Sequence, residues 1–168
     1  MDTFIEQLVA KRSTAKDTIF RILIVLGVLV VAVISYFLSI LTPLPMIGML
    51  VLVGGCYGAY FLMTSLNVEY EYIVTNGELD IDKIIARRKR KRLLTVSAKT
   101  FEEFGPYTEN TSFEAAQTTV EATDASGQGI YYAVFRHPAH GQTSLFFTPD
   151  ERVLEAIKIA LPRNIRTR

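Results

Sequence analysis

A stretch of 47 residues without a charged side chain, from Ile22 to Val68, constrains this chain more than any other feature. A helix rises about 1.5 Å per residue, so roughly 20 apolar residues cross the hydrocarbon core of a bilayer. Pro43 and Pro45 interrupt the stretch, and proline lacks the amide donor that a continuing helix needs. The sequence therefore predicts a transmembrane helical hairpin over residues 22–66, with spans at about 22–41 and 46–66. Such a chain is not a cytosolic enzyme, a secreted disulfide scaffold or a disordered tail.

Positive charges flank the predicted spans on one side only. Lys11, Arg12, Lys16 and Arg21 precede the first span, and the loop between the spans has no Lys or Arg. The other 14 of the 18 basic residues follow the second span. Because cytoplasmic flanks are enriched in Lys and Arg, we expect a multi-pass membrane protein with both termini in the cytoplasm.

Residues 1–21 are predicted to form a separate cytoplasmic segment. Phe4, Ile5, Leu8 and Val9 fall on one face of a helix, which predicts a short amphipathic helix at the membrane surface. A frayed polar tail is the alternative. The segment is long and mixed in charge, and no small-residue cleavage site follows the apolar run, so a cleavable signal peptide is not expected.

The second span is rich in small residues. Gly54 and Gly58 form one small-xxx-small pair and Gly55 with Ala59 forms another, a spacing that lets helices approach closely. Packing against the first span is the simpler interpretation, and a homodimer seam is the alternative. The single cysteine, Cys56, cannot form an intramolecular disulfide. Neither span contains Asp, Glu, Lys, Arg or His, which argues against a transporter, a proton relay or an intramembrane protease.

Residues 67–168 are long enough for one small domain and carry mainly strand signals. Alternating β-branched and aromatic residues predict strands at 68–75 and 78–86 around Asn76-Gly77, the strongest short hairpin signal. Further strands are expected near residues 94–98, 118–123, 130–136 and 143–148, and residues 113–117 are compatible with a helix.

The hydrophobic period changes from strand to helix near the end of the chain. Thr148 and Glu151 form a capping-box pair, and Pro162 ends the apolar periodicity. A C-terminal helix is therefore expected at about 150–161. The predicted domain is an antiparallel sheet, or partly open barrel, capped by this helix.

Antiparallel strands closed by an amphipathic helix are the layout of pleckstrin-homology-like (PH-like) domains. The segment Tyr-Glu-Tyr-Ile-Val-Thr-Asn-Gly-Glu-Leu-Asp-Ile-Asp-Lys-Ile, at residues 70–84, is similar to their opening hairpin, in which a Tyr-x-x-Thr strand and a turn lead into a Leu-x-Ile strand. The whole chain resembles a family of small two-span bacterial membrane proteins with a C-terminal PH-like domain. The resemblance implies a fold and a location in the inner membrane, and no activity. Phosphoinositide-binding relatives keep basic residues in the first hairpin loop, where this chain has Asn76-Gly77.

Six consecutive basic residues form the most concentrated charge of the predicted domain. They are Arg87, Arg88, Lys89, Arg90, Lys91 and Arg92. Without them, residues 69–168 carry 8 basic and 14 acidic side chains. Strand alternation would turn half of such a run toward the core, so we expect it to project as a hairpin tip or as strand ends beyond the core.

Three interpretations of this basic run remain open. It orients the domain on anionic lipid headgroups, where each basic residue contributes on the order of 1 kcal/mol within a Debye length of about 8–10 Å. It docks an acidic protein or a nucleic acid, although residues 87–99 lack the Phe or Tyr that would stack on bases, so nucleic acid is not expected. The third interpretation is a solvated hairpin that pairs with the domain's own acids, such as Asp80, Asp82, Glu102 and Glu103.

No catalytic site is expected. His137 and His140 lie in one turn with a proline between them, and no cysteine or carboxylate cluster completes a zinc site, so neither a metal nor a cofactor is predicted. No Gly-rich phosphate loop, nucleophile elbow or His-Glu-x-x-His motif is present. The sequence predicts a non-catalytic, membrane-anchored scaffold or interaction module, oriented on anionic lipid. The alternative is an accessory subunit of a larger membrane complex, in which Gly54 and Gly58 contact partner helices.

Overall fold

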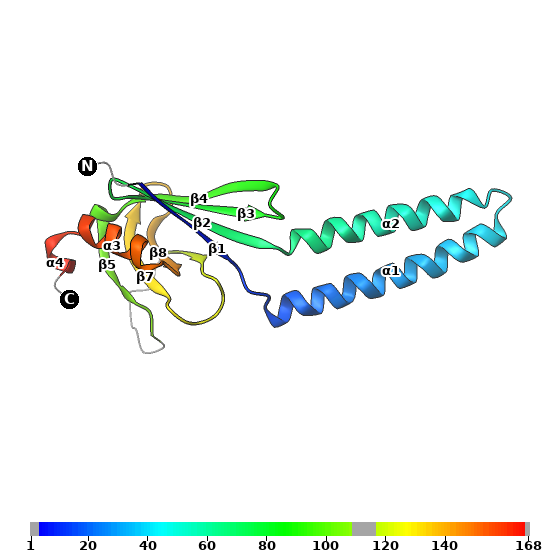
Figure 1. Cartoon of the computed structure of the whole chain (residues 1–168), viewed down its shortest axis with the longest axis horizontal. Coiled ribbons are helices and arrows are strands. Elements are labelled where there is room, and N and C mark those ends of the chain that lie inside the picture. The colour runs from blue at the N-terminus through cyan, green and yellow to red at the C-terminus, as the bar shows by residue number, and fades with distance from the viewer. Residues whose placement is uncertain (1–3, 109–116, 167–168) are drawn as a thin grey trace. The chain divides into compact units, whose positions relative to one another are not determined.

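The computed structural model describes residues 4–108 and 117–166 (Figure 1). The chain divides into two compact units, Met1–Arg12 with Val68–Arg168 and Ser13–Asn67. The first unit is mainly β and the second is a helical hairpin. The β unit therefore begins before the hairpin in the sequence and resumes after it, so it is not a purely C-terminal domain.

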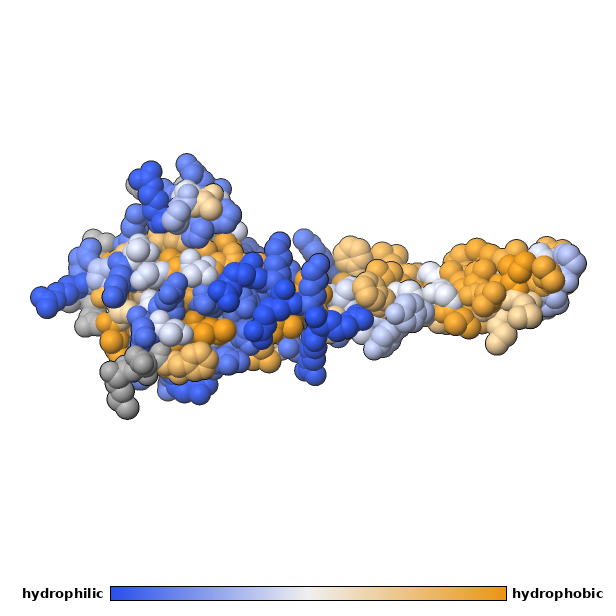
Figure 2. Space-filling view, turned by 90° about the horizontal axis from the view of Figure 1, so that it is seen from above, coloured by the Kyte–Doolittle hydropathy of each residue, from blue (hydrophilic) through white to orange (hydrophobic). Residues whose placement is uncertain are grey.

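The helical hairpin consists of α1 (Ala15–Leu41) and α2 (Met46–Ser65). A capping box starts α1 before the apolar stretch, because Thr14 Oγ1 accepts the Asp17 amide and Asp17 Oδ2 accepts the Thr14 amide. Both helices are long and apolar enough to cross a membrane. Hydrophobic residues cover much of the visible surface of this unit (Figure 2).

Glycines bring the two helices together, but they are not the glycines of the predicted Gly54–Gly58 pair. A methyl group added at Gly55 would lie 2.6 Å from Val31 Cγ1, and one at Gly48 would overlap Ser39 Oγ. A methyl group at Gly54 or Gly58 would meet no atom within 4 Å. Gly55, from the second predicted small-residue pair, therefore faces α1, whereas Gly54 and Gly58 have no described neighbour on that helix.

The N-terminal segment is a β-strand, β1 (Phe4–Ala10), and the prediction of an amphipathic helix or a polar tail is wrong. It pairs antiparallel with β2 (Val68–Thr75) from Phe4↔Thr75 to Ala10↔Glu69. A helix of seven residues is marginal alone, whereas a strand satisfies its backbone on the edge of β2. Residues 1–21 are consequently not a separate segment.

The first sheet has the strand order β1-β2-β3-β4, with β3 at Glu78–Ile85 and β4 at Lys89–Ser97. Asn76 and Gly77 form the predicted turn with φ of 51° and 85°. A second turn joins β3 to β4, where Ala86 and Arg87 have φ of 55° and 54° and the Arg88 amide donates to the Ile85 carbonyl at 3.1 Å. Asn-Gly suits positive φ, whereas Ala-Arg does not, so only the first turn was visible in the sequence.

The second sheet has the order β5-β7-β8-β6. Its strands are β5 (Phe101–Pro106), β6 (Thr118–Ala122), β7 (Tyr131–His137) and β8 (Gly141–Phe147), and η1 (Ala98–Thr100) precedes β5. β6 runs parallel to β8, so the prediction of a wholly antiparallel sheet is wrong for this pair. The strands described form two sheets and no closed barrel. The helix expected at 113–117 lies, apart from Gln117, outside the described residues.

The C-terminal helix α3 (Glu151–Ala160) is followed by the short α4 (Arg163–Arg166). Asp150 caps α3 by accepting the Val153 amide at 2.8 Å, in place of the predicted Thr148. Val153 and Ile157 are fully buried, so α3 covers part of the core.

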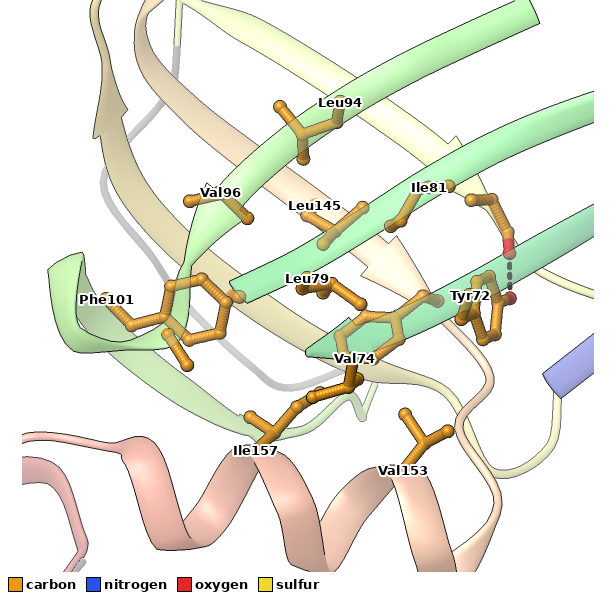
Figure 3. Close-up of a cluster of buried hydrophobic side chains, with 14 of the residues drawn as sticks. Tyr72, Val74, Leu79, Ile81, Leu94, Val96, Phe101, Leu145, Val153 and Ile157 are labelled. Carbon is orange, nitrogen blue, oxygen red and sulfur yellow. Dashed lines mark hydrogen bonds between the residues drawn. The ribbon is translucent and has the colours of Figure 1, made fainter. Parts of the chain in front are cut away.

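The core of the β unit lies between the two sheets and α3 (Figure 3). Its fully buried residues include Tyr72, Leu79, Ile81, Phe135, Leu145 and Phe147. The Tyr72 hydroxyl donates to the Ala122 carbonyl and accepts the Thr148 amide at 3.2 Å. Burial raises the pKa of this phenol, so it stays protonated and holds the two sheets together.

Candidate functional site

The face of the first sheet that points away from the core carries a row of acids. Strand alternation places Glu69 and Glu71 of β2 on this face together with Asp80 and Asp82 of β3. Glu71 and Asp82 are paired directly across the strands, and each is less than 5% exposed. These four carboxylates, which we call the acidic face, require cations because burying unpaired charge is costly.

Three arginines of the basic run supply those cations. The ion pairs are Arg87 Nε–Glu69 Oε1 (3.0 Å), Arg90 Nη2–Glu71 Oε1 (2.9 Å), Arg92 Nε–Asp82 Oδ1 (2.5 Å) and Arg92 Nη1–Asp80 Oδ1 (2.9 Å). The interpretation that the run pairs with the domain's own acids therefore holds for Arg87, Arg90 and Arg92. Its partners include the predicted Asp80 and Asp82, and in the described part of the chain no ion pair joins the run to Glu102 or Glu103.

A β-bulge allows this charged run to enter a strand. The register shifts between Ile81 and Asp82, so that Ile81 pairs with Leu94 but Asp82 pairs with Arg92. Without the shift, Leu94 and Arg92 would point to the same side of the sheet. With it, Leu94 enters the core while Arg92 reaches the acidic face. Residues 89–92 thus lie within β4, and only Ala86–Arg88 forms the hairpin tip.

The lysines of the run point to the opposite side of the hairpin. Lys91 pairs across the strands with Lys83, and Lys89 pairs with Ile85. Lys89 and Lys91 are exposed and Lys83 is half-buried. Like charges directly opposite each other are destabilising, and no carboxylate described in the structure lies within ion-pair distance of these three side chains. We call Lys83, Lys89 and Lys91 the lysine face.

The lysine face lies at the end of the sheet where the chain enters and leaves the helical hairpin. β1 ends at Ala10, which pairs with Glu69, and β2 begins at Val68, which pairs with Ile85. Ile85 in turn pairs with Lys89. These pairs lie at the same end of the sheet. The lysine face is therefore at the end where β1 leads into α1 and where α2 leads into β2.

Glu71 is the least satisfied charge of the acidic face. Arg90 occupies its Oε1, but its Oε2 is buried without a hydrogen-bond partner. Burial raises the pKa of Glu71, Arg90 lowers it, and the neighbouring Glu6 carboxyl raises it further, so that the net direction is upward. Sequence reasoning missed Glu6 and Glu71, because nothing local indicates that residues 65 positions apart become neighbours.

Other candidate chemistry is sparse in the described part of the chain. His137 and His140 stack with ring centroids 4.8 Å apart, and the Ala139 amide donates to His137 Nδ1 at 3.2 Å. No group of three or more His, Cys, Asp or Glu side chains within residues 4–108 and 117–166 is placed to hold a metal ion. The concentrated charge of the first sheet is therefore the main functional candidate.

Comparison with known proteins places this arrangement in a family. No curated protein and no solved structure matches the chain. The family model described as "Bacterial PH-like domain (DUF6106)" matches residues 1–167, and this range includes β1 and both helices of the hairpin. The chain therefore belongs to this family of bacterial PH-like domains.

Proposed function

We propose that this protein is a non-catalytic interaction module of the bacterial inner membrane, anchored by α1 and α2 with both termini in the cytoplasm. In this proposal the lysine face orients the PH-like domain on anionic phospholipid headgroups. The observation that carries it is the division of the basic run, since Arg87, Arg90 and Arg92 are paired internally while Lys89, Lys91 and the neighbouring Lys83 are not.

The place of the lysine face in the sheet supports a role at the membrane. It shares one end of the first sheet with both connections to the hairpin, and each connection is only a few residues long. A chain extends at most about 3.6 Å per residue, so the lysines of an anchored domain stay within the reach of the surface potential. At roughly 1 kcal/mol each, three lysines orient a tethered domain without having to recruit it.

The test uses the full-length protein in nanodiscs, with Cys56→Ser and a nitroxide on Ala86→Cys at the hairpin tip. Its accessibility to a nickel chelate on lipid headgroups is compared between phosphatidylcholine discs and discs that also contain phosphatidylglycerol. We expect greater accessibility in the anionic discs, lost at high salt and in the Lys83→Gln, Lys89→Gln, Lys91→Gln variant.

A matched control removes the same charge elsewhere. Replacing Lys99, Lys158 and Arg163 by Gln should leave the effect of anionic lipid intact. Equal accessibility in both kinds of disc would contradict the lipid-orienting role, as would an equal loss in the control.

A second candidate function, an accessory subunit of a membrane complex, is supported by Gly54 and Gly58. Both present an open small-residue surface on α2, where no atom of the chain lies within 4 Å of an added methyl group. Such surfaces let a partner helix approach closely. If this function holds, Gly54→Val with Gly58→Val should abolish co-purification of a membrane partner or homodimer, and the lysine substitutions should not.

A further inference from the structure

Among the strands of residues 4–108 and 117–166, β1 lies at the edge of the first sheet, and no described strand pairs with its outer side. It pairs with β2 alone, through seven consecutive residues without a register shift. The Lys11 amide donates to the Val68 carbonyl, so by alternation the amides of Val9 and Gln7 also face β2, and those of Leu8 and Glu6 point outward. The Gln7 side chain accepts the Asp150 amide at 2.8 Å and donates to the Thr148 carbonyl at 3.1 Å, and beyond β1 the Arg12 amide donates to the Asp124 carbonyl at 2.8 Å.

Proteins usually protect an exposed edge strand with lysine, proline or a bulge. Phe4–Ala10 contains none of these, and its only charge is Glu6. On the outer side of β1, Phe4 is 65% exposed and Leu8 is 56% exposed, with Glu6 between them. An exposed edge of seven residues with apolar side chains is a template for another strand.

The acidic face beside this edge has more carboxylates than arginines in the ion pairs described. Its four carboxylates share three arginines, and Glu6 adds a fifth carboxylate next to Glu71. Glu71 is 4% exposed, and its Oε2 has no hydrogen-bond donor. Neighbouring carboxylates repel each other, and a Lys or Arg beside Glu6 would offset the negative charge that Glu6 and Glu71 share.

We infer that the free edge of β1 binds an extended segment of a partner protein, which adds a strand next to β1 and places a Lys or Arg beside Glu6 and Glu71. Apolar side chains two residues before and after that cation would cover Phe4 and Leu8, because alternate residues share one face of a strand. This inference rests on the proposed role as an interaction module, and it specifies the surface and the chemistry of the partner.

A second copy of this chain does not fit the same edge. Its β1 would bring another Glu6 and no cation, since Phe4–Ala10 has no Lys or Arg. Antiparallel pairing of two β1 strands would also put their Ala10 ends, which lead into α1, at opposite ends of the joint sheet.

The test selects displayed strand-length peptides on the full-length protein in phosphatidylcholine nanodiscs. Because these discs lack anionic lipid, the outcome does not depend on the lysine face. We expect enriched peptides with a Lys or Arg flanked at i−2 and i+2 by apolar residues. Their binding should protect the Glu6 and Leu8 amides from hydrogen exchange, with no gain at Gln7 and Val9.

Charge reversal makes the test decisive. Glu6→Lys should weaken the selected peptides by roughly tenfold or more and should select acidic residues in place of the cation. The matched control, Glu78→Lys on the same face of β3, should leave their binding unchanged. The inference would be overturned if the selected peptides bound the Glu6→Lys variant as tightly as they bind the unsubstituted protein. The inference would also be overturned if no selected peptide protected the Glu6 and Leu8 amides from hydrogen exchange. Protection of these amides by the lipid alone, without peptide, would overturn it as well.

Discussion

Tyr72 joins the two sheets through one hydroxyl group. The hydroxyl donates to the Ala122 carbonyl and accepts the Thr148 amide, and the residue is fully buried. Tyr72→Phe would leave both backbone groups without this partner, and we expect it to lower the free energy of unfolding by about 1–3 kcal/mol. Thermal and urea unfolding, followed by circular dichroism, measures this loss.

Tyr70→Phe is the matched control for that substitution. Tyr70 lies on the same face of β2 and is 7% exposed, and no hydrogen bond of its hydroxyl is described. Its removal should change the free energy of unfolding by less than about 0.5 kcal/mol. Equal losses for the two variants would show that the Tyr72 hydroxyl does not join the sheets as described.

Glu71 gives stability a pH dependence of unusual sign. Burial is the main cause of its raised pKa, so the folded protein binds a proton that the unfolded chain releases at lower pH. The stability contributed by protonated Glu71 is present below its ordinary pKa and is lost as the pH rises from that value through the raised one. Glu71→Gln should remove this part of the pH dependence, because glutamine keeps an oxygen for Arg90 and offers an amide to Glu6.

Unfolding midpoints at a series of pH values measure the effect. Glu78→Gln, at the far end of the same face, serves as control and should keep the pH profile of the original protein. An unchanged profile in Glu71→Gln would rule out Glu71 as the group responsible.

At the scale of the elements, adjacent glycines of α2 differ sharply. A side chain at Gly55 must displace Val31, whereas one at Gly54 meets nothing within the chain. We expect Gly55→Val to lower hairpin stability by about 1–3 kcal/mol through overpacking and Gly54→Val to have a much smaller effect. Unfolding of the full-length protein in mixed micelles with increasing dodecyl sulfate compares the two. A larger loss for Gly54→Val would contradict the packing of α2 on α1.

Elements with local signals were predictable from the sequence, and β1 was not. Asn76-Gly77 between two alternating segments predicts the hairpin of β2 and β3, which the structure confirms. In β1, Phe4, Ile5, Leu8 and Val9 fit the helical period and also divide between the two faces of a strand. Pairing with β2, which follows the helical hairpin in the sequence, makes this segment a strand and not a helix. No local sequence pattern reveals so distant a partner.

The candidate site was predictable only in outline. Six consecutive cations marked the region, but their division into an arginine side and a lysine side depends on the bulge between β3 and β4. After the bulge, the residues of β4 that face the core alternate in the opposite phase. The position of a bulge does not follow from the alternation of residues in the sequence. The acids that bind the arginines come from β2 and β3, so their role follows from strand register.

For the whole molecule, the sequence order of the two units is the central feature. A helical hairpin inserted between β1 and β2 means that the PH-like fold closes only when both flanks of the hairpin meet. A fragment that starts at β2 would lack an edge strand that contributes Val9 to the core. If the hairpin crosses a membrane as proposed, the residues before α1 and after α2 must lie on the same side of it, because β1 pairs with β2.

Cross-linking in native membranes tests this claim most directly. Glu6 and Ile73 are partners across β1 and β2 on the outer face, and such partners lie close enough for a disulfide. In a Cys56→Ser background, mild oxidation should cross-link Glu6→Cys with Ile73→Cys, detected as a shift in electrophoretic mobility. Gln7→Cys with Ile73→Cys, whose side chains point to opposite faces, should not react. Failure of the first pair, or equal reaction of both, would contradict a PH-like domain assembled from the residues on both sides of the helical hairpin.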